Sequence, residues 1–256
     1  MMTKPLYQKA KSIEALSANF ADIEKRIQQA CQRANRETGS VRLLPVTKTV
    51  DEDIIRMAFT LGYDYFGENK VQEAVEKQES MNDLPINWSV IGHLQTNKIK
   101  YVARFATEFQ ALDSLKVAKR LNERLQLEDR HMEVLIQVNT SDEASKYGLH
   151  PTEVADFIEQ IKSLDRLRVK GLMTLALLSN NAEKVRDCFI LLRNIRDGLL
   201  DTLPANMSMQ ELSMGMSGDF EIAIEEGATI VRVGQAIFGA RALPDSHYWP
   251  ENHINN

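Results

Sequence analysis

The sequence predicts an α/β protein: a single (β/α)8 barrel of the TIM type with an extra N-terminal helix. Three observations predict this fold. After a leading helical stretch, strand-like and helix-like segments alternate eight times along the 256 residues. Most of the strand-like segments are continuous apolar runs, which is typical of parallel strands that are buried on both faces. A length near 250 residues is ordinary for one such barrel.

The leading helix is predicted at about residues 11–36, because apolar residues recur there at helical spacing. These residues are Ile13, Leu16, Phe20, Ile23, Ile27 and Ala30. The eight predicted strands are residues 41–48, 64–69, 86–93, 107–113, 132–140, 167–176, 209–215 and 228–234. The helices predicted to follow them are residues 52–61, 70–80, 96–105, 114–126, 151–163, 182–201 and 217–226, with a short helix or turn at 235–241.

The whole chain, residues 1–256, is predicted to form one domain. The barrel is expected over about residues 41–241, and residues 242–256 are expected to be a loose C-terminal tail. We find no break in composition that would indicate a second domain. No G-x-G-x-x-G turn follows the first strand, which disfavours an open dinucleotide-binding sheet.

Composition excludes several classes of function. The net charge of −5 gives no global field that would favour nucleic acid. No apolar run approaches the roughly 18 residues of a membrane span, and the first residues do not resemble a secretory signal. Cys31 and Cys188 form neither a metal-binding pattern nor a disulfide framework. We therefore expect a cytoplasmic protein without a metal site.

Active sites of such barrels lie at the carboxyl ends of the strands, so the polar residues there are the candidates. Lys48 ends the otherwise apolar first strand. Enclosure by the barrel walls lowers the pKa of an amine, and a neutral amine can attack an aldehyde. The alternative is a lysine that emerges into solvent at the strand end.

The ends of the seventh and eighth strands resemble a phosphate site. The turn SMGMSGDF contains Ser213, Met214, Gly215 and Ser217, and Ser217 is the expected N-cap of the next helix. After the eighth strand, Gly234 allows a ligand to approach the backbone closely. Phosphate sites after strands 7 and 8 recur in this fold. The alternative is an ordinary turn that needs Ser and Gly for its geometry.

Two further strand ends present chemically useful side chains. Arg232 lies two residues before Gly234, where it could face a ligand ring or pair with a carboxylate. His93 is the single histidine at a strand end, and a polar loop histidine is more often a bystander than a catalyst. No three candidate ligands share the spacing of a metal site.

Together these segments resemble the YggS/PROSC family, the pyridoxal 5′-phosphate (PLP) homeostasis proteins. The matching segments are LLPVTK (43–48), FGENKVQE (66–73), WSVIGHLQTNK (88–98), the region from QVNT to KYGL (137–149), GLMTLA (171–176), LSMGMSGDFEIAI (212–224) and VRVGQAIFGAR (231–241). They span nearly the whole chain in the order of the family. The resemblance implies the barrel of the alanine racemase N-terminal domain, without the second domain of that enzyme, and PLP as the cofactor.

The resemblance also implies roles for individual residues. Lys48 would be the lysine that forms an imine with PLP, and Asn69 would lie close to the cofactor. The residues implied to surround the phosphate are Ser213, Ser217, Gly234 and Gln235. Arg232 would face the pyridine nitrogen, and its charge would disfavour protonation of that nitrogen. An unprotonated ring is a weaker electron sink, which limits most PLP chemistry.

Gln235 departs from the family, which usually has Thr or Ser at this position. A hydroxyl contact to the phosphate is therefore lost, while the backbone N–H remains. We expect that PLP binding is retained with an altered affinity.

The first functional hypothesis is a non-catalytic PLP carrier that limits free PLP, with PLP-dependent apoenzymes as candidate recipients. The alternative is a racemase-type PLP enzyme, in which Lys48 acts on one face and His93 is a remote candidate for the other. Racemisation needs this second acid or base. In alanine racemase it is a tyrosine, and the sequence shows no obvious tyrosine at the barrel mouth. A third, weaker hypothesis is a Schiff-base aldolase without PLP. A lone barrel is compatible with a monomer.

Overall fold

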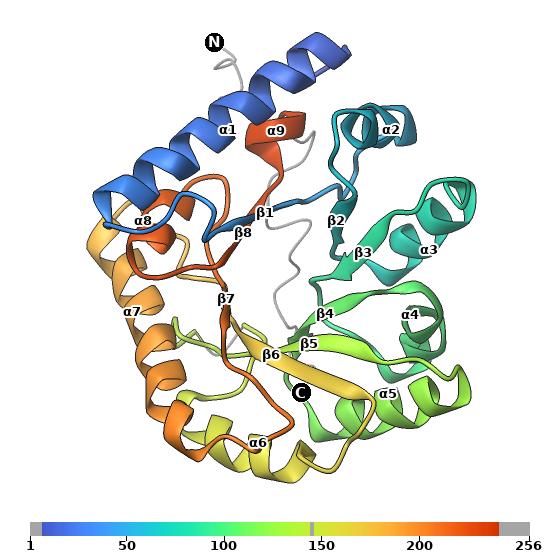
Figure 1. Cartoon of the computed structure of the whole chain (residues 1–256), viewed down its shortest axis with the longest axis vertical. Coiled ribbons are helices and arrows are strands. Elements are labelled where there is room, and N and C mark those ends of the chain that lie inside the picture. Colours follow the sequence, from blue (N-terminus) through green and yellow to red (C-terminus); the bar gives the residue numbers. More distant parts are fainter. Residues whose placement is uncertain (1–6, 144–145, 241–256) are drawn as a thin grey trace, which may run out of the picture.

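The computed structural model describes residues 7–143 and 146–240, and they form a barrel of eight parallel strands surrounded by helices (Figure 1). The strand order is β1-β8-β7-β6-β5-β4-β3-β2, so sequential strands are neighbours throughout. The seam between β1 and β2 is joined by a single bridge between Val46 and Gly67, with the Thr47 N–H donating to the Gly67 carbonyl at 3.0 Å. The predicted fold class is confirmed.

The strands are β1 (Arg42–Pro45), β2 (Tyr65–Glu68), β3 (Asn87–Val90), β4 (Glu108–Leu112), β5 (Met132–Gln137), β6 (Leu167–Met173), β7 (Glu211–Ser213) and β8 (Ile230–Val233). The α-helices are α1 (Ile13–Arg33), α2 (Glu52–Thr60), α3 (Val71–Ser80), α4 (Ile99–Phe105), α5 (Leu115–Leu127), α6 (Val154–Ile161), α7 (Ala182–Leu199), α8 (Phe220–Glu225) and α9 (Gln235–Phe238). The short 3-10 helices are η1 (Thr96–Lys98), η2 (Pro151–Glu153) and η3 (Leu200–Thr202). Every predicted strand and helix is present, and most are shorter than predicted.

The leading helix α1 is confirmed as an extra element outside the eight repeats. It lies along α8 and α9 (Figure 1) and buries Leu16, Phe20 and Ile23 against them and the barrel. Each such side chain contributes roughly 1.5–3 kcal/mol of burial. Ser12 caps the helix by accepting from the Ala15 N–H at 3.3 Å. Because α8 and α9 are short, α1 completes the helical cover on this side of the barrel.

One predicted boundary is wrong at a place that affects the site. The helix predicted at residues 217–226 begins at Phe220, and its N-cap is Asp219 rather than Ser217. Gly215 takes φ +93°, and the Met216 N–H donates to the Asp219 carboxylate at 2.5 Å. This left-handed turn uses three further residues before the helix can start.

Three further expectations concern the C-terminal tail, membrane-spanning helices and the cysteines. The predicted tail, residues 242–256, lies outside the described residues. Among the helices of residues 7–143 and 146–240, none is both long and apolar enough to cross a membrane. The two cysteines, Cys31 and Cys188, are buried free thiols.

Candidate functional site

The predicted site residues gather on four strands that are consecutive around the barrel, β7, β8, β1 and β2. Arg232 pairs in register with Leu44 of β1, and its N–H donates to the Gly215 carbonyl after β7 at 3.0 Å. Lys48 follows β1, and Asn69 follows β2. Because all four strands are parallel, their carboxyl ends meet at one end of the barrel.

Lys48 lies in a turn beyond the end of β1 and is buried, with 2% of its surface exposed. The strand itself ends at Pro45, three residues earlier than predicted. The turn is closed by the Val50 N–H donating to the Thr47 carbonyl at 2.9 Å. The alternative of a lysine that emerges into solvent is therefore wrong.

A buried ionic network stabilises the turn that contains Lys48. The Lys77 ammonium donates to the Thr47 carbonyl at 2.6 Å and to the carboxylates of Glu68 and Glu73, each at 2.7 Å. The Thr47 hydroxyl donates to Glu68 at 2.6 Å. Glu73 also accepts from the N–H of Thr49, whose φ of +62° is rare for a β-branched residue. The residues on both sides of the buried lysine are thus fixed by α3 and β2.

Glu68 has a strongly altered pKa. It is fully buried, and burial raises its pKa to about 7 in spite of the charge of Lys77. One of its carboxylate oxygens, Oε2, has no hydrogen-bond partner among the described residues. Sequence reasoning missed this network, because its members come from β2, α3 and the turn after β1 and no local pattern links them.

Asn69 is buried where the chain leaves β2, and its position depends on close backbone packing. A Cβ atom at Gly92 would lie 2.1 Å from the Asn69 carbonyl oxygen. Only glycine allows the end of β3 to pass this close. The structure therefore explains why a glycine is needed at position 92, just beyond β3. Contact of Asn69 with a cofactor stays a prediction.

Arg232 is held inside the barrel, with 3% of its surface exposed. Its guanidinium donates to the Ser213 hydroxyl at 2.6 Å and to the Thr174 carbonyl at 2.7 Å. Both acceptors are neutral oxygens. Among the described residues, Arg232 therefore forms no direct ion pair with a carboxylate, which was the alternative. Burial lowers the pKa of Arg232 to about 10, while the charges of Asp219 and Glu108 act in the opposite direction. Arg232 stays a cation at neutral pH.

Ser213 has a different environment from the one its sequence position suggested. Its hydroxyl accepts from Arg232 and donates to the Gln110 side-chain carbonyl at 2.6 Å. It is fully buried. Both contacts orient the arginine, whereas contact of Ser213 with a phosphate stays a prediction. Sequence reasoning missed Gln110, although a glutamine in the middle of the apolar strand EFQAL was a signal.

The turn after β7 packs on α8 and is bonded to the start of α9. A Cβ atom at Gly215 would lie 2.6 Å from the Ala223 Cβ, which presses this turn onto α8. The Ser217 hydroxyl accepts from the Ala236 N–H at 3.3 Å and so joins the turn to the start of α9. Gly234 is the N-cap of α9, and Gln235 is its first residue. Met214 is fully buried, and its N–H donates to the Ile230 carbonyl at 3.1 Å.

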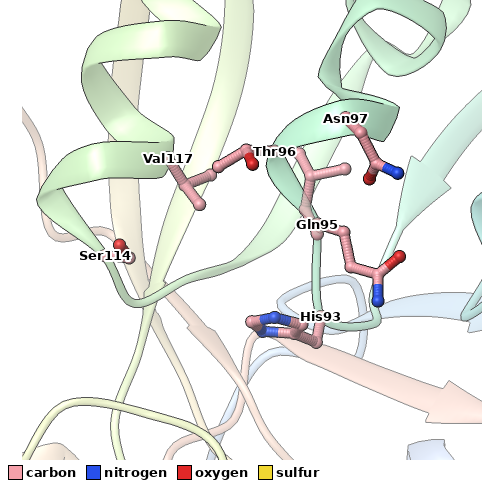
Figure 2. A pocket seen from close by; sticks show the side chains of 7 residues that line it. His93, Gln95, Thr96, Asn97, Ser114 and Val117 are labelled. Atoms are coloured by element: carbon pink, nitrogen blue, oxygen red, sulfur yellow. The ribbon is translucent and has the colours of Figure 1, made fainter.

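A second polar region lies beyond β3 and β4. Figure 2 shows His93 and Gln95 on the loop after β3, across from Ser114 and Val117. These residues line an open pocket of about 420 Å³. The exposed His93 ring stacks on Tyr147 with ring centroids 4.1 Å apart. The sequence-based statement that no tyrosine lies at the barrel mouth is therefore corrected, because Tyr147 is placed there by the loop after β5.

No cluster of three or more His, Cys, Asp or Glu side chains that could hold a metal occurs in residues 7–143 and 146–240. The donors gathered at the four strand ends are an amine, a guanidinium, hydroxyl groups and backbone amides. These groups bind anions and carbonyl compounds rather than metals.

The chain is similar to proteins of known name over most of its length. The model of the alanine racemase N-terminal domain matches residues 18–242. The pyridoxal phosphate homeostasis protein of Aquifex aeolicus (strain VF5) is 42% identical over 217 residues, which are 85% of this chain and 94% of that protein. The structure of PipY from Synechococcus elongatus PCC7942 with PLP bound has a TM-score of 0.75 at 33% identity, covering 85% of this chain and all of PipY.

A more distant likeness concerns the fold alone. Alanine racemase from Clostridium difficile 630 has a TM-score of 0.66 at 15% identity, covering 96% of this chain and 61% of the racemase. The barrel is therefore shared with that enzyme, and the activity has to be argued from the site.

Proposed function

The chain belongs to the family of pyridoxal phosphate homeostasis proteins, and on that premise we propose that it binds PLP covalently on Lys48 and limits free PLP. The single observation that supports this most is the burial of Lys48 beside the strand that holds Arg232. The named relatives are PLP homeostasis proteins, and PipY was solved with PLP bound.

The residues present suit the chemistry of PLP. The cofactor has an aldehyde for an amine, a ring nitrogen that can accept from a guanidinium, and a phosphate for backbone amides and hydroxyls. Lys48, Arg232 and the joined turns at Ser217 and Gly234 supply these groups on adjacent strands. The positive φ of Gly215 lets the turn pack closely on α8.

In this proposal each residue has a limited role. Lys48 holds the aldehyde carbon, Arg232 faces the ring nitrogen, and Asn69 lies near the cofactor. The phosphate is bound by the Ser217 hydroxyl and by the amides of Gly234 and Gln235. The turn residues Met214 and Gly215 contribute backbone, and Ser213 acts through Arg232.

When bound, PLP supplies a reactive aldehyde and an electron-accepting ring. The cationic Arg232 disfavours a proton on that ring nitrogen, because two positive charges would then be adjacent. The ring is thereby a poor electron acceptor. The site therefore suits holding PLP more than using it for catalysis.

A racemase-type enzyme is the second candidate, and the His93–Tyr147 stack at the barrel mouth is the observation in its favour. Such an enzyme needs an acid or base on the face opposite Lys48. Loss of optical purity of single-enantiomer amino acids measures the activity. Turnover well above that of free PLP, abolished in both Lys48→Ala and Tyr147→Phe, would overturn the carrier-only proposal.

The covalent site is tested by borohydride reduction of the PLP-loaded protein, followed by peptide mass spectrometry. We expect a PLP-sized adduct on Lys48 and its loss in Lys48→Met. Lys70→Met is the matched control, because Lys70 is exposed and lies one residue after Asn69. An adduct that persists on another lysine in Lys48→Met at wild-type yield would contradict the assignment. A visible absorption band discharged by borohydride also excludes an aldolase without PLP as the main state.

The site of action and the recipients belong to the same proposal. Two buried free thiols suit a reducing compartment such as the cytoplasm. PLP-dependent apoenzymes are the recipients that a PLP reservoir would serve. Incubation of the loaded protein with an apoenzyme, with and without a free-PLP trap, distinguishes direct transfer from release.

A further inference from the structure

A chain of polar side chains runs through the interior of the barrel and is not explained by PLP contacts. The Ser213 hydroxyl donates to Gln110, and the Gln110 amide donates to Glu108 at 2.6 Å. Glu108 also accepts from Arg42 and Ser89, each at 2.7 Å. Because β7 and β4 are separated by two strands in the sheet, the bond between Ser213 and Gln110 must cross the barrel interior.

This series of hydrogen-bonded side chains extends from one end of the barrel to the other. Arg42 and Glu108 begin β1 and β4 at the amino-terminal end, whereas Arg232 lies near the carboxyl end of β8. Glu108 is 2% exposed and Gln110 is fully buried. Arg42 is the member nearest to solvent, with 34% of its side chain exposed.

The donors in this chain all point the same way. Arg232 donates to Ser213, Ser213 donates to Gln110, and Gln110 donates to the Glu108 carboxylate. A carboxylate can only accept, and a guanidinium can only donate, so the two ends fix the orientation of everything between them. The Gln110 amide cannot be reversed without placing its oxygen against Glu108.

We propose that Glu108 and Gln110 are positioning residues that fix the guanidinium of Arg232 through Ser213. The positive charge is thereby held in place without direct contact with a carboxylate, so that it can act on the ligand. This inference rests on the proposed function for the identity of that ligand as PLP. Glu108, the anion that Arg232 reaches through this network, lies three hydrogen bonds away. Asp219 also acts on Arg232 through its charge, without an ion pair among the described residues. A carboxylate in direct contact would instead neutralise the guanidinium at the ring nitrogen.

Burial of the charges of Glu108 and Arg232 carries a desolvation penalty, so stability alone does not explain the network. Buried charges pay a large desolvation penalty, and well-packed apolar residues of similar volume are often as stable. A polar chain in which every member is satisfied instead specifies one arrangement of its side chains. Arg232 is the member of the chain that reaches the candidate site.

The test compares two variants that each remove one donor from the same Glu108 oxygen. Gln110→Met cuts the path to Arg232, while Ser89→Ala removes a donor that lies outside that path. The first readout uses the protein without PLP. It is the NMR signal of slowly exchanging guanidinium protons of Arg232, assigned by its loss in Arg232→Lys. We expect that signal to broaden or exchange at least about tenfold faster in Gln110→Met and to be retained in Ser89→Ala.

The second readout is PLP binding, followed by absorption. We expect the dissociation constant to rise about tenfold in Gln110→Met and to stay within about twofold in Ser89→Ala. A wild-type Arg232 signal in Gln110→Met would overturn the positioning role, whatever happens to PLP. If no variant and no wild-type protein binds PLP, the proposed function fails, and the signal in the PLP-free protein still decides the inference.

Discussion

At the scale of single residues, the buried lysine is best understood through the charges behind it. Glu68, Lys77 and Glu73 hold the backbone on both sides of Lys48 through hydrogen bonds to Thr47 and Thr49. Glu68 is fully buried and has a carboxylate oxygen without a hydrogen-bond partner among the described residues. The turn that presents the lysine is therefore stabilised by a network whose charge state depends on pH.

Glu68→Gln tests this dependence. The pKa of Glu68 is raised to about 7 from the ordinary 4.5, so the folded state binds the proton more tightly than the unfolded state. The contribution of Glu68 to stability is therefore fully present below the unfolded value and is lost as pH rises toward 7. We expect the free energy of unfolding of Glu68→Gln, relative to wild type, to improve by up to about 3 kcal/mol between about pH 5 and about pH 8.

Urea denaturation of both proteins at the two pH values measures this difference. Glu73→Gln is the control, because Glu73 lies at the more exposed edge of the same network. A difference between wild type and Glu68→Gln that does not change with pH would contradict a titrating Glu68.

Sequence reasoning found the residues that are visible at strand ends and missed those that act from inside. Lys48, Arg232 and the turn after the seventh strand were predicted, because polar residues end apolar runs there. Gln110 was missed, because its partner Ser213 is 103 positions away in the chain. No local pattern reports a contact across the barrel interior. For the same reason, the sequence did not show that the Ser213 hydroxyl bonds to Arg232 and Gln110, whereas its predicted contact with a phosphate stays a prediction.

At the scale of elements, the alternation of apolar runs and amphipathic helices was sufficient to predict all eight repeats. The boundaries were less predictable where a turn competes with a helix. Ser217 is a residue type that often caps helices. Because Gly215 is left-handed and the Met216 N–H donates to Asp219, α8 instead begins at Phe220. Single-residue turn geometry of this kind depends on packing against α8, which the sequence does not display.

Gly92→Ala tests how one strand end positions the next. A Cβ at this position meets the Asn69 carbonyl oxygen at 2.1 Å, so the ends of β2 and β3 must move apart. We expect a loss of about 1–3 kcal/mol of stability and weaker PLP binding. Gly198→Ala is the matched control, since Gly198 lies within α7 with no atom within 4 Å of the added Cβ. It should raise stability by up to about 1 kcal/mol.

Thermal melts and PLP titrations of the two variants give the result. If Gly92→Ala binds PLP as tightly as wild type while losing stability, Asn69 has no part in the binding site. If instead Gly92→Ala melts at the same temperature as wild type, the close approach of the ends of β2 and β3 is wrong.

At the scale of the whole molecule, the barrel is unevenly joined. β5 and β6 pair over six residues, whereas β1 and β2 meet at the single bridge between Val46 and Gly67. Lys48 lies two residues beyond this bridge, so the proposed covalent site is placed at a weakly paired seam. β7 and β8 likewise pair in register at a single position, Ser213 with Ile230. Local opening follows the number of backbone hydrogen bonds that must break.

Hydrogen exchange followed by mass spectrometry tests whether PLP closes this seam. Without PLP, we expect the peptide containing the Thr47 amide, which bonds to Gly67, to exchange faster than the peptides of β5 and β6. With PLP, contacts from β1 to the turns after β7 and β8 should slow that exchange by about tenfold or more, because a ligand stabilises the state that binds it. Lys48→Met with PLP is the control and should keep the faster exchange. Equal protection of the seam and of β5–β6 in the PLP-free protein would show that the helices, rather than strand pairing, hold the barrel closed.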